Sequence, residues 1–452
     1  MAGGGAPTGA IRAAGATLSK FQEVYSFGLI LSLFFLWGFS YSLVDVLNKK
    51  VQNSFGITTT ESTAIQACYF GAYFVCSIPA SWSATRFGYR ITILGGLVLY
   101  IIGSLLFWPA AHYAVYWPFP VCAFVTASGL CTLEVMANAY MSVLGSPEKA
   151  AFRLNLGLAF NGLAGVIGPQ IASHTFLKDD SEDLDQLQWT YVGVAGLGAL
   201  LFVLFIFSKL PEITEDDNEE AQEEFGVVDD RPLWKRKHTV LGFVTQFCYV
   251  GAQCSVAGLT LNYLTDKGAY STPRATQLFS YLQVTYMLCR FIGAVAVCYI
   301  PATLVLLAHA LVCSAFSLMA SFTSGQTGLV ALFFVFGGES ILYVTIFTLA
   351  VQNNGKRTKR SSGLLCMGVG GGAVMPSIQA TVADARSIEL SWLVPGTLGY
   401  MPIVAYAVGM HVYNRRWAAR RAAAAGQGVE AALPSPTEMY EDKAAAEKLD
   451  RA

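Results

Sequence analysis

The sequence predicts an all-α membrane protein in which twelve transmembrane helices form two pseudo-symmetric six-helix bundles. Two observations support this fold class: the composition of the chain and the number of its long apolar segments. Of the 452 residues, 54% are hydrophobic and 13% are charged, whereas a soluble domain carries about 25% charged residues. So few charges cannot cover a water-facing surface, and the net charge of -1 provides no basic field for nucleic acid. A soluble enzyme, a disordered protein and a nucleic-acid-binding protein are therefore poor fits.

The predicted spans are apolar segments of about 20 residues or more, the length that crosses a bilayer. They lie at 25–47, 63–83, 91–111, 116–144, 152–177, 189–209, 239–264, 275–299, 301–322, 326–351, 362–384 and 389–413. A polar segment follows the sixth span, and its stretch 212–230 holds ten acidic residues and no Lys or Arg. Such a run repels itself and stays solvated, so we expect a flexible linker between two bundles.

The basic residues predict the orientation, because Lys and Arg collect in cytoplasmic loops. With the N-terminus inside, 22 of the 29 basic residues fall on the inner side, 6 on the outer side, and Arg290 within a span. We therefore expect both termini in the cytoplasm, and, without a retention signal, the plasma membrane. The predicted domains are a cytoplasmic tail (1–24), a first bundle (25–210), the acidic linker (211–238), a second bundle (239–413) and a cytoplasmic tail (414–452).

Weak internal matches indicate that the two bundles are repeats. Leu36-Trp37-Gly38 resembles Tyr249-Val250-Gly251, which follows it by 213 residues, and Glu134 parallels Glu339 at an offset of 205. Six spans plus six, with a long middle loop, is the layout of a major facilitator transporter, whose substrate site lies near the midplane between the halves. Arg86-Phe87-Gly88-Tyr89-Arg90 partly resembles the signature of that superfamily, with Thr85 in place of the expected acid.

Three acidic residues lie within or beside the spans: Asp45, Glu134 and Glu339. A charge at the bilayer centre is costly, so such residues usually face the bundle interior or a wet cavity. Glu134 lies deep in span four, where burial favours the neutral carboxyl group, and we favour it as a proton-coupling site. The alternative is a neutral, hydrogen-bonded acid that fixes helix packing. For Asp45 and Glu339 a functional and a structural role both stay open.

Side chains suited to sugar binding also gather in the spans. Planar polar groups pair with adjacent sugar hydroxyls, and aromatic rings stack on the C–H faces. The intramembrane supply is Trp37, Tyr41, Asn138, Asn155, Asn161, Gln246, Tyr249, Gln253, Asn262, Gln283 and Tyr343. Each alone is explained by helix packing, but their density on spans one, four, five and seven favours a sugar site. We expect Arg290 to pair with backbone carbonyls or an acid.

No enzyme motif is present, and we expect no metal and no cofactor other than protons as coupling ion. The ten cysteines fall inside spans without a C-x-x-C pair, and the five histidines form no metal-binding pattern. Gly368 to Ala373 matches G-x-G-x-x-A, but it lies in span eleven with no preceding strand.

Several segments, in order along residues 25–410, resemble the major facilitator branch of fucose–proton symporters and glucose/galactose permeases. They are Phe34 to Gly38 with Asp45, Tyr100 to Ala111, Leu133-Glu134 with Ala137-Asn138, Phe152 to Leu156, Gln246 to Gln253, Thr345 to Phe347, and Thr358-Lys359 with Ser361 to Gly363. The resemblance implies import of a monosaccharide, L-fucose or a related hexose such as galactose or glucose, driven by a proton gradient through alternating access. It also implies that Glu134 carries the proton and that Asp45 faces the cavity and couples sugar binding to protonation.

The resemblance also implies polar cavity positions at Asn161, Tyr249 and Gln253. Our candidate substrate-binding set is Trp37, Asp45, Asn138, Asn161, Tyr249, Gln253 and Glu339. The chain departs from bacterial fucose symporters at Tyr41, Ser42, Leu158 and Ala257, which leaves the identity of the sugar open. Besides the sugar, the proton and the lipid bilayer we expect no partner, and a functional monomer. A passive sugar facilitator and a non-transporting membrane sugar receptor remain alternatives.

Overall fold

The computed structural model describes residues 20–55, 59–144, 150–174, 185–208, 210–211, 232–266, 268, 270–352, 354 and 357–432. Within these residues, ten helical segments are long and apolar enough to cross a membrane. One of them, Ala64–His112, contains two predicted spans, and α4 (Ala150–His174) supplies the span predicted at 152–177. Each of the twelve predicted spans therefore coincides with helix. Residues up to Ala407 form one compact unit, and residues from Val408 form a second, the remainder of the last helix.

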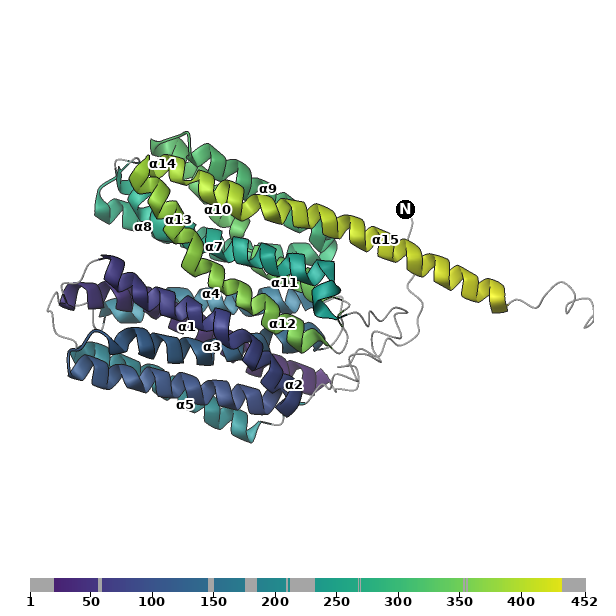
Figure 1. Ribbon diagram of the computed structural model, residues 1–452, viewed down its shortest axis with the longest axis horizontal. Helices are drawn as coiled ribbons and strands as arrows, with labels where there is room; N and C mark the ends of the chain where they lie inside the picture. Colours follow the sequence, from purple (N-terminus) through teal and green to yellow (C-terminus); the bar gives the residue numbers. More distant parts are fainter. Residues whose placement is uncertain are drawn as a thin grey trace, which may run out of the picture. The chain divides into compact units, whose positions relative to one another are not determined.

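The first half contains α1 (Lys20–Phe55), α2 (Thr59–His112), α3 (Pro118–Val143), α4 and α5 (Asp185–Phe207). In Figure 1, α1, α2, α3 and α5 lie together, in purple, blue and teal. Two contacts bring the start of α1 and the turn in α2 to the end of α5: Tyr25 Oη donates to Ser208 Oγ at 3.1 Å, and Arg90 Nε donates to the Phe205 carbonyl at 3.3 Å. We call this end of the compact unit the Lys20 end.

The helix α2 contains a reversal at Gly88, where φ is 82° and ψ is 176°. The hydroxyl oxygens of Ser83 and Thr92 lie 3.2 Å apart, although nine residues separate them. In a straight helix nine residues span about 13.5 Å, so the chain must turn back between them. Gly88 permits this turn because it has no Cβ. The two spans predicted at 63–83 and 91–111 are therefore separate crossings within one continuous segment.

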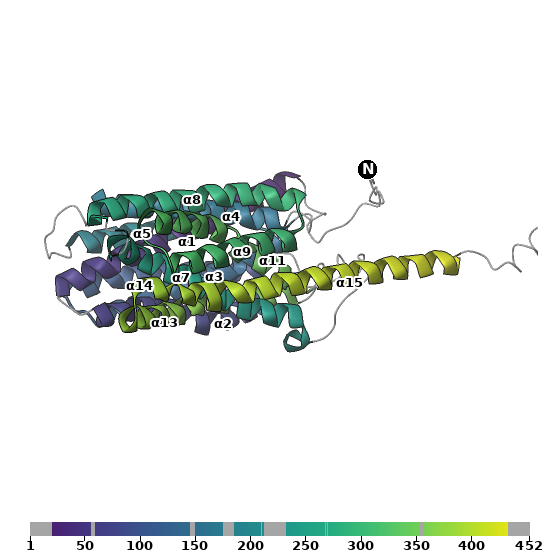
Figure 2. The ribbon, with the colours of Figure 1, turned by 90° about the horizontal axis from the view of Figure 1, so that it is seen from above.

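The second half is divided into more elements, several of them short. They are η2 (Leu233–Lys235), α7 (Lys237–Asp266), α8 (Thr272–Tyr299), α9 (Ala302–Ala320), α10 (Gly325–Glu339), α11 (Leu342–Val351), α12 (Thr358–Met367), η4 (Gly368–Gly370), α13 (Gly371–Ala385), α14 (Ile388–Ser391), η5 (Pro395–Gly399) and α15 (Tyr400–Ala432). Figure 2 shows α8 along one edge of this half, and α8 contacts both α7 and α9.

The span predicted as one helix over 326–351 is broken. Helix α10 ends at Glu339 and α11 begins at Leu342, so Ser340 and Ile341 lie between two helices. Ile341 has φ of −113°, which is outside the usual helical range. Such a break frees backbone groups that need other partners inside a membrane protein. Its position places Glu339 at the end of one helix and Tyr343 at the start of the next.

The two halves meet where α12 lies against α2 and α3, and where α4 lies against α8 and α11. At the Lys20 end, Lys359 on α12 is buried, and its ammonium donates to the Ala84 carbonyl at 3.3 Å. The same ammonium lies 4.4 Å from the centre of the Tyr89 ring. Close to it, a Cβ added to Gly363 would lie 2.5 Å from the Ser81 side chain. The halves are therefore in close contact at the Lys20 end.

Candidate functional site

Glu134 lies on α3 and is only 2% exposed. The hydroxyl of Tyr343, from α11 of the other half, donates a hydrogen bond to Glu134 Oε1. Asn138, one turn further along α3, donates to the same oxygen at 3.5 Å. Within the described part of the chain, Oε2 is buried and has no hydrogen-bond partner. The carboxyl group thus sits at the contact between the halves and is held on one oxygen only.

Aromatic and polar side chains from three further helices surround this contact. The Trp37 ring on α1 lies 6.2 Å from that of Tyr343, and the Tyr249 ring on α7 lies 6.4 Å from it. Asn138 also donates to Cys366 Sγ on α12 at 3.7 Å. We call this set the Glu134 cluster; its members are Trp37, Glu134, Asn138, Tyr249, Tyr343 and Cys366. It places three candidate substrate-binding residues, drawn from both halves, around Glu134.

This arrangement can bind and release a proton. An ionised carboxylate away from water is costly unless hydrogen bonds satisfy it, and here Tyr343 is the close donor. A proton on Glu134 removes the negative charge that makes the Tyr343 hydrogen bond strong. The protonation state of Glu134 and the contact between the halves therefore depend on each other.

Glu339 lies in a separate set of contacts within the second half. It is 2% exposed, and Tyr400 Oη on α15 donates to its Oε1 at 2.5 Å. Tyr249 Oη donates to the backbone carbonyl of Glu339 at 3.0 Å. Tyr249 is thus the residue that connects Glu339 with the Glu134 cluster. The structure places the Glu339 carboxyl group against Tyr400, and its assignment to the substrate stays a prediction.

Gln253 and Arg290 extend the Glu339 set, because Arg290 interacts electrostatically with Glu339 and Tyr286 contacts Tyr249. Gln253 Nε2 donates to Tyr286 Oη at 2.7 Å. Arg290 is buried and donates to the carbonyl of Ser340 at 2.7 Å and to that of Leu158 at 2.9 Å. The expectation that Arg290 pairs with backbone carbonyls is confirmed.

The two remaining candidates lie on other parts of the first half. Asn161 Nδ2 donates to the Phe34 carbonyl at 3.2 Å and so ties α4 to α1. Gly38 permits this approach, because a Cβ there would lie 2.1 Å from the Asn161 carbonyl oxygen. Asp45 falls within α1, but its side chain lies outside the described residues.

Sequence reasoning missed Tyr286, Cys366 and Tyr400, and it left Tyr343 outside the candidate substrate-binding set. Tyr343 was one of many polar intramembrane residues, and nothing singled it out. A tyrosine buried in a span must find a partner for its hydroxyl, which is the only signal that could have found three of them. Cys366 was assigned to packing along with the other cysteines.

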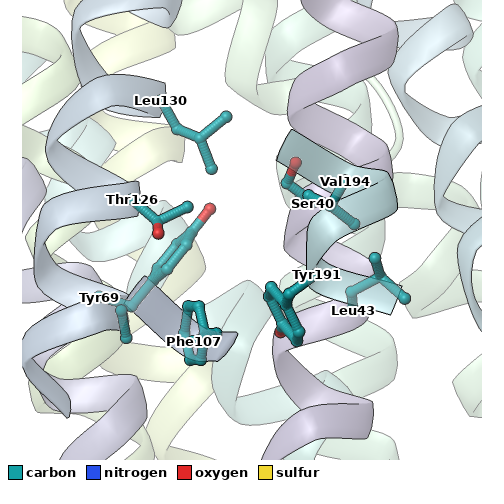
Figure 3. A pocket seen from close by; sticks show the side chains of 9 residues that line it. Ser40, Leu43, Tyr69, Phe107, Thr126, Leu130, Tyr191 and Val194 are labelled. Carbon is teal, nitrogen blue, oxygen red and sulfur yellow. The ribbon is translucent and has the colours of Figure 1, made fainter. Parts of the chain in front are cut away.

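A small cavity lies elsewhere in the first half (Figure 3). It measures about 10 Å³, and the side chains of Ser40, Tyr69, Phe107, Thr126 and Tyr191 are among those that line it. A volume of about 10–15 Å³ holds one water molecule. This cavity contains none of the candidate residues and is too small for a sugar. Among the described residues, no group of three His, Cys, Asp or Glu side chains could hold a metal ion.

Comparison with known proteins identifies the family. The profile of the Major Facilitator Superfamily matches residues 26–374. The chain is 35% identical over 400 residues to the glucose/galactose transporter of Brucella abortus biovar 1 (strain 9-941), covering 86% of this chain and 94% of that protein. It is 30% identical over 394 residues to the L-fucose-proton symporter of Escherichia coli (strain K12), covering 82% of this chain and 90% of that one.

A solved structure agrees with the fold. The crystal structure of the Major Facilitator Superfamily transporter FucP in the outward conformation matches with a TM-score of 0.75 and 28% identity, over 86% of this chain and 99% of that chain. The resemblance predicted from the ordered sequence segments is therefore confirmed, and so is the expectation of a transporter rather than an enzyme. The chain is an integral, multi-pass membrane protein and belongs to the Major Facilitator Superfamily.

Proposed function

We propose that this protein is a proton-coupled monosaccharide symporter that works by alternating access. Its substrate is L-fucose or a related hexose such as galactose or glucose. Two relatives that align over most of their length carry the names glucose/galactose transporter and L-fucose-proton symporter. The observation that carries the proposal is the hydrogen bond from Tyr343 to Glu134, because it joins a buried acid of one half to the other half.

Glu134 carries the proton in this scheme. With the carboxylate ionised, Tyr343 holds the two halves together beside α3 and α11. Protonation weakens that bond, because the acceptor loses its charge. Tyr343 and Glu134 can then exchange their mutual hydrogen bond for bonds to the sugar or to water. The halves separate beside α3 and α11. Asp45 couples sugar binding to this step, an assignment that rests on the family resemblance alone.

The sugar binds around the Glu134 cluster. Trp37 and Tyr249 offer aromatic faces from α1 and α7, one from each half. Asn138, Asn161 and Gln253 offer amides that pair with hydroxyl groups, each after exchanging its present protein partner. Glu339 supports this site from the second half through Tyr249.

The protein lies in the plasma membrane as a functional monomer with both termini in the cytoplasm. The division into bundles at 25–210 and 239–413, joined by an acidic linker, belongs to the same proposal. In this orientation the Lys20 end faces the cytoplasm, and the contact of Lys359 with Ala84 closes the protein on that side. Because the cytoplasmic side is closed in this scheme, the sugar enters from the outside.

The test is uptake of radiolabelled L-fucose, D-galactose and D-glucose by proteoliposomes, with and without an imposed inward proton gradient. A symporter accumulates one of these sugars above the outer concentration only with the gradient, and a protonophore abolishes the accumulation. Equilibration that ignores the gradient identifies a passive facilitator. Binding of a sugar without flux identifies a receptor. Either of the last two results refutes the proposal.

A further inference from the structure

Arg290 forms a contact between the halves that the scheme above does not use. It lies on α8, is 3% exposed, and each nitrogen of its guanidinium group has a partner. Nε donates to the Ser340 carbonyl at 2.7 Å, and Nη1 donates to the Leu158 carbonyl of α4 at 2.9 Å. Nη2 donates to Tyr286 Oη, whose ring lies 4.5 Å from the guanidinium carbon. One side chain therefore binds α4 of the first half and the helix break of the second.

The partner in the second half is the break between α10 and α11. Ser340 precedes Tyr343 by three residues, with Ile341 and the first residue of α11 between them. The packing around the break is tight: a Cβ added to Gly293 of α8 would lie 2.1 Å from Ile341. Arg290 therefore holds the end of the break that precedes α11, the helix that carries Tyr343.

The partner in the first half is α4, which Figure 2 shows beside α8. The bond to the Leu158 carbonyl exists only while α4 and α8 lie against each other. A guanidinium group suits this place, because its rigid fork presents several donors in fixed directions. A lysine ammonium in the same position is a compact charge that cannot reach both carbonyls and Tyr286 together.

We propose that Arg290 is the positioning residue that sets Tyr343 against Glu134, and that it does so only while α4 and α8 are in contact. The hydrogen bond between Tyr343 and Glu134 then depends on a second contact between the halves, the one between α4 and α8. The expected effect of Arg290 on transport rests on the proposed function. The expected effect of Arg290 on the position of Tyr343 does not.

The experiment compares Arg290→Gln and Tyr343→Phe, singly and together, in the full-length protein reconstituted in liposomes. Arg386→Gln is the matched control, because Arg386 is an exposed arginine of the same half. We expect sugar counterflow in Arg290→Gln to stay within about threefold of the wild type, while accumulation driven by the gradient falls at least tenfold. The pH profile of counterflow should move from the wild-type curve onto that of Tyr343→Phe. The double variant should be no worse than either single one, because both act through one contact.

A second readout does not depend on transport. The Trp37 ring lies 6.2 Å from Tyr343, so a displaced Tyr343 changes the fluorescence of Trp37. That emission is isolated by subtracting the spectrum of the same variant with Trp37→Phe. Arg290→Gln should change it in the same sense as Tyr343→Phe, and Arg386→Gln should leave it unchanged. Arg290→Lys, which keeps the charge, replaces Arg290→Gln if the latter does not fold.

The outcomes separate the two proposals. If the wild type accumulates sugar but Arg290→Gln keeps its pH profile and Trp37 emission, the role of Arg290 is refuted and symport stands. Effects of Arg290→Gln and Tyr343→Phe that multiply in the double variant also refute it. If the wild type does not accumulate sugar, symport is refuted, and the Trp37 emission still decides whether Arg290 positions Tyr343.

Discussion

The substitution Tyr343→Phe removes one oxygen atom from the contact between the halves. That hydroxyl is the close donor to Glu134 Oε1, and Asn138 reaches the same atom only at 3.5 Å. Oε2 has no hydrogen-bond partner among the described residues, although the Tyr73 hydroxyl interacts with the same carboxyl group. The aromatic ring remains, so its packing against Trp37 and Tyr249 is kept. The variant therefore tests the hydrogen bond rather than the shape of the site.

The size of the effect follows from the type of bond. A hydrogen bond to a charged group is worth about 1.5–3 kcal/mol. Since about 1.4 kcal/mol corresponds to a factor of ten in an equilibrium, the loss shifts the balance between joined and separated halves roughly 10- to 150-fold. We expect accumulation at a fixed proton gradient to fall by at least tenfold, with counterflow largely retained.

The assay measures both quantities on the same proteoliposomes, with Tyr406→Phe as the control. Tyr406 is also buried, and its hydroxyl donates to the His238 carbonyl at 3.1 Å within the second half. Both variants lose one buried hydroxyl, but only Tyr343→Phe loses a contact between the halves. The reasoning is refuted if the two variants accumulate sugar equally well, or if Tyr343→Phe loses counterflow and accumulation in the same proportion.

Two further substitutions test the packing that supports the site. Gly38→Ala places a Cβ 2.1 Å from the Asn161 carbonyl oxygen, so α1 and α4 must separate and the thermal unfolding temperature should drop sharply; Gly28→Ala, with nothing within 4 Å, should leave it unchanged or slightly raised. Equal melting temperatures for the two variants would contradict this. Lys359→Met removes a buried cation–π contact and a hydrogen bond at the Lys20 end, together worth about 1–3 kcal/mol. Hydrogen exchange of the α12 amides should therefore accelerate at least fivefold, and an unchanged rate would show that Lys359 does not hold this end closed.

Much of the fold could be predicted because the membrane imposes simple rules. A span needs a long apolar segment, and each of the twelve predicted segments coincides with helix. Glu134 could be selected for the same reason, since an acid in a span needs an explanation. Asn138 and Tyr249 followed from the chemistry of sugar binding, and both lie in the Glu134 cluster.

The contacts between distant segments could not be predicted in this way. Tyr343 and Glu134 are 209 residues apart, and hydropathy says nothing about which faces of two spans meet. The break at Ser340 was also missed, because an apolar segment reads the same whether its helix is continuous or interrupted. Only the structure shows that Arg290 supplies a donor to the carbonyl of that break. Hydropathy thus predicts the helices, and the polar contacts between them define the site.

The most direct test of symport is the movement of protons with sugar. Proteoliposomes in lightly buffered medium receive L-fucose, D-galactose or D-glucose in turn, and an external pH electrode records the response for the wild type and for Glu134→Gln. We predict that one sugar makes the medium more alkaline in the wild type, because protons enter with it. Glu134→Gln should give no pH change with that sugar while it still exchanges labelled for unlabelled sugar. A wild-type protein that moves sugar with no pH change, or a Glu134→Gln variant that keeps the full change, would contradict the role of Glu134.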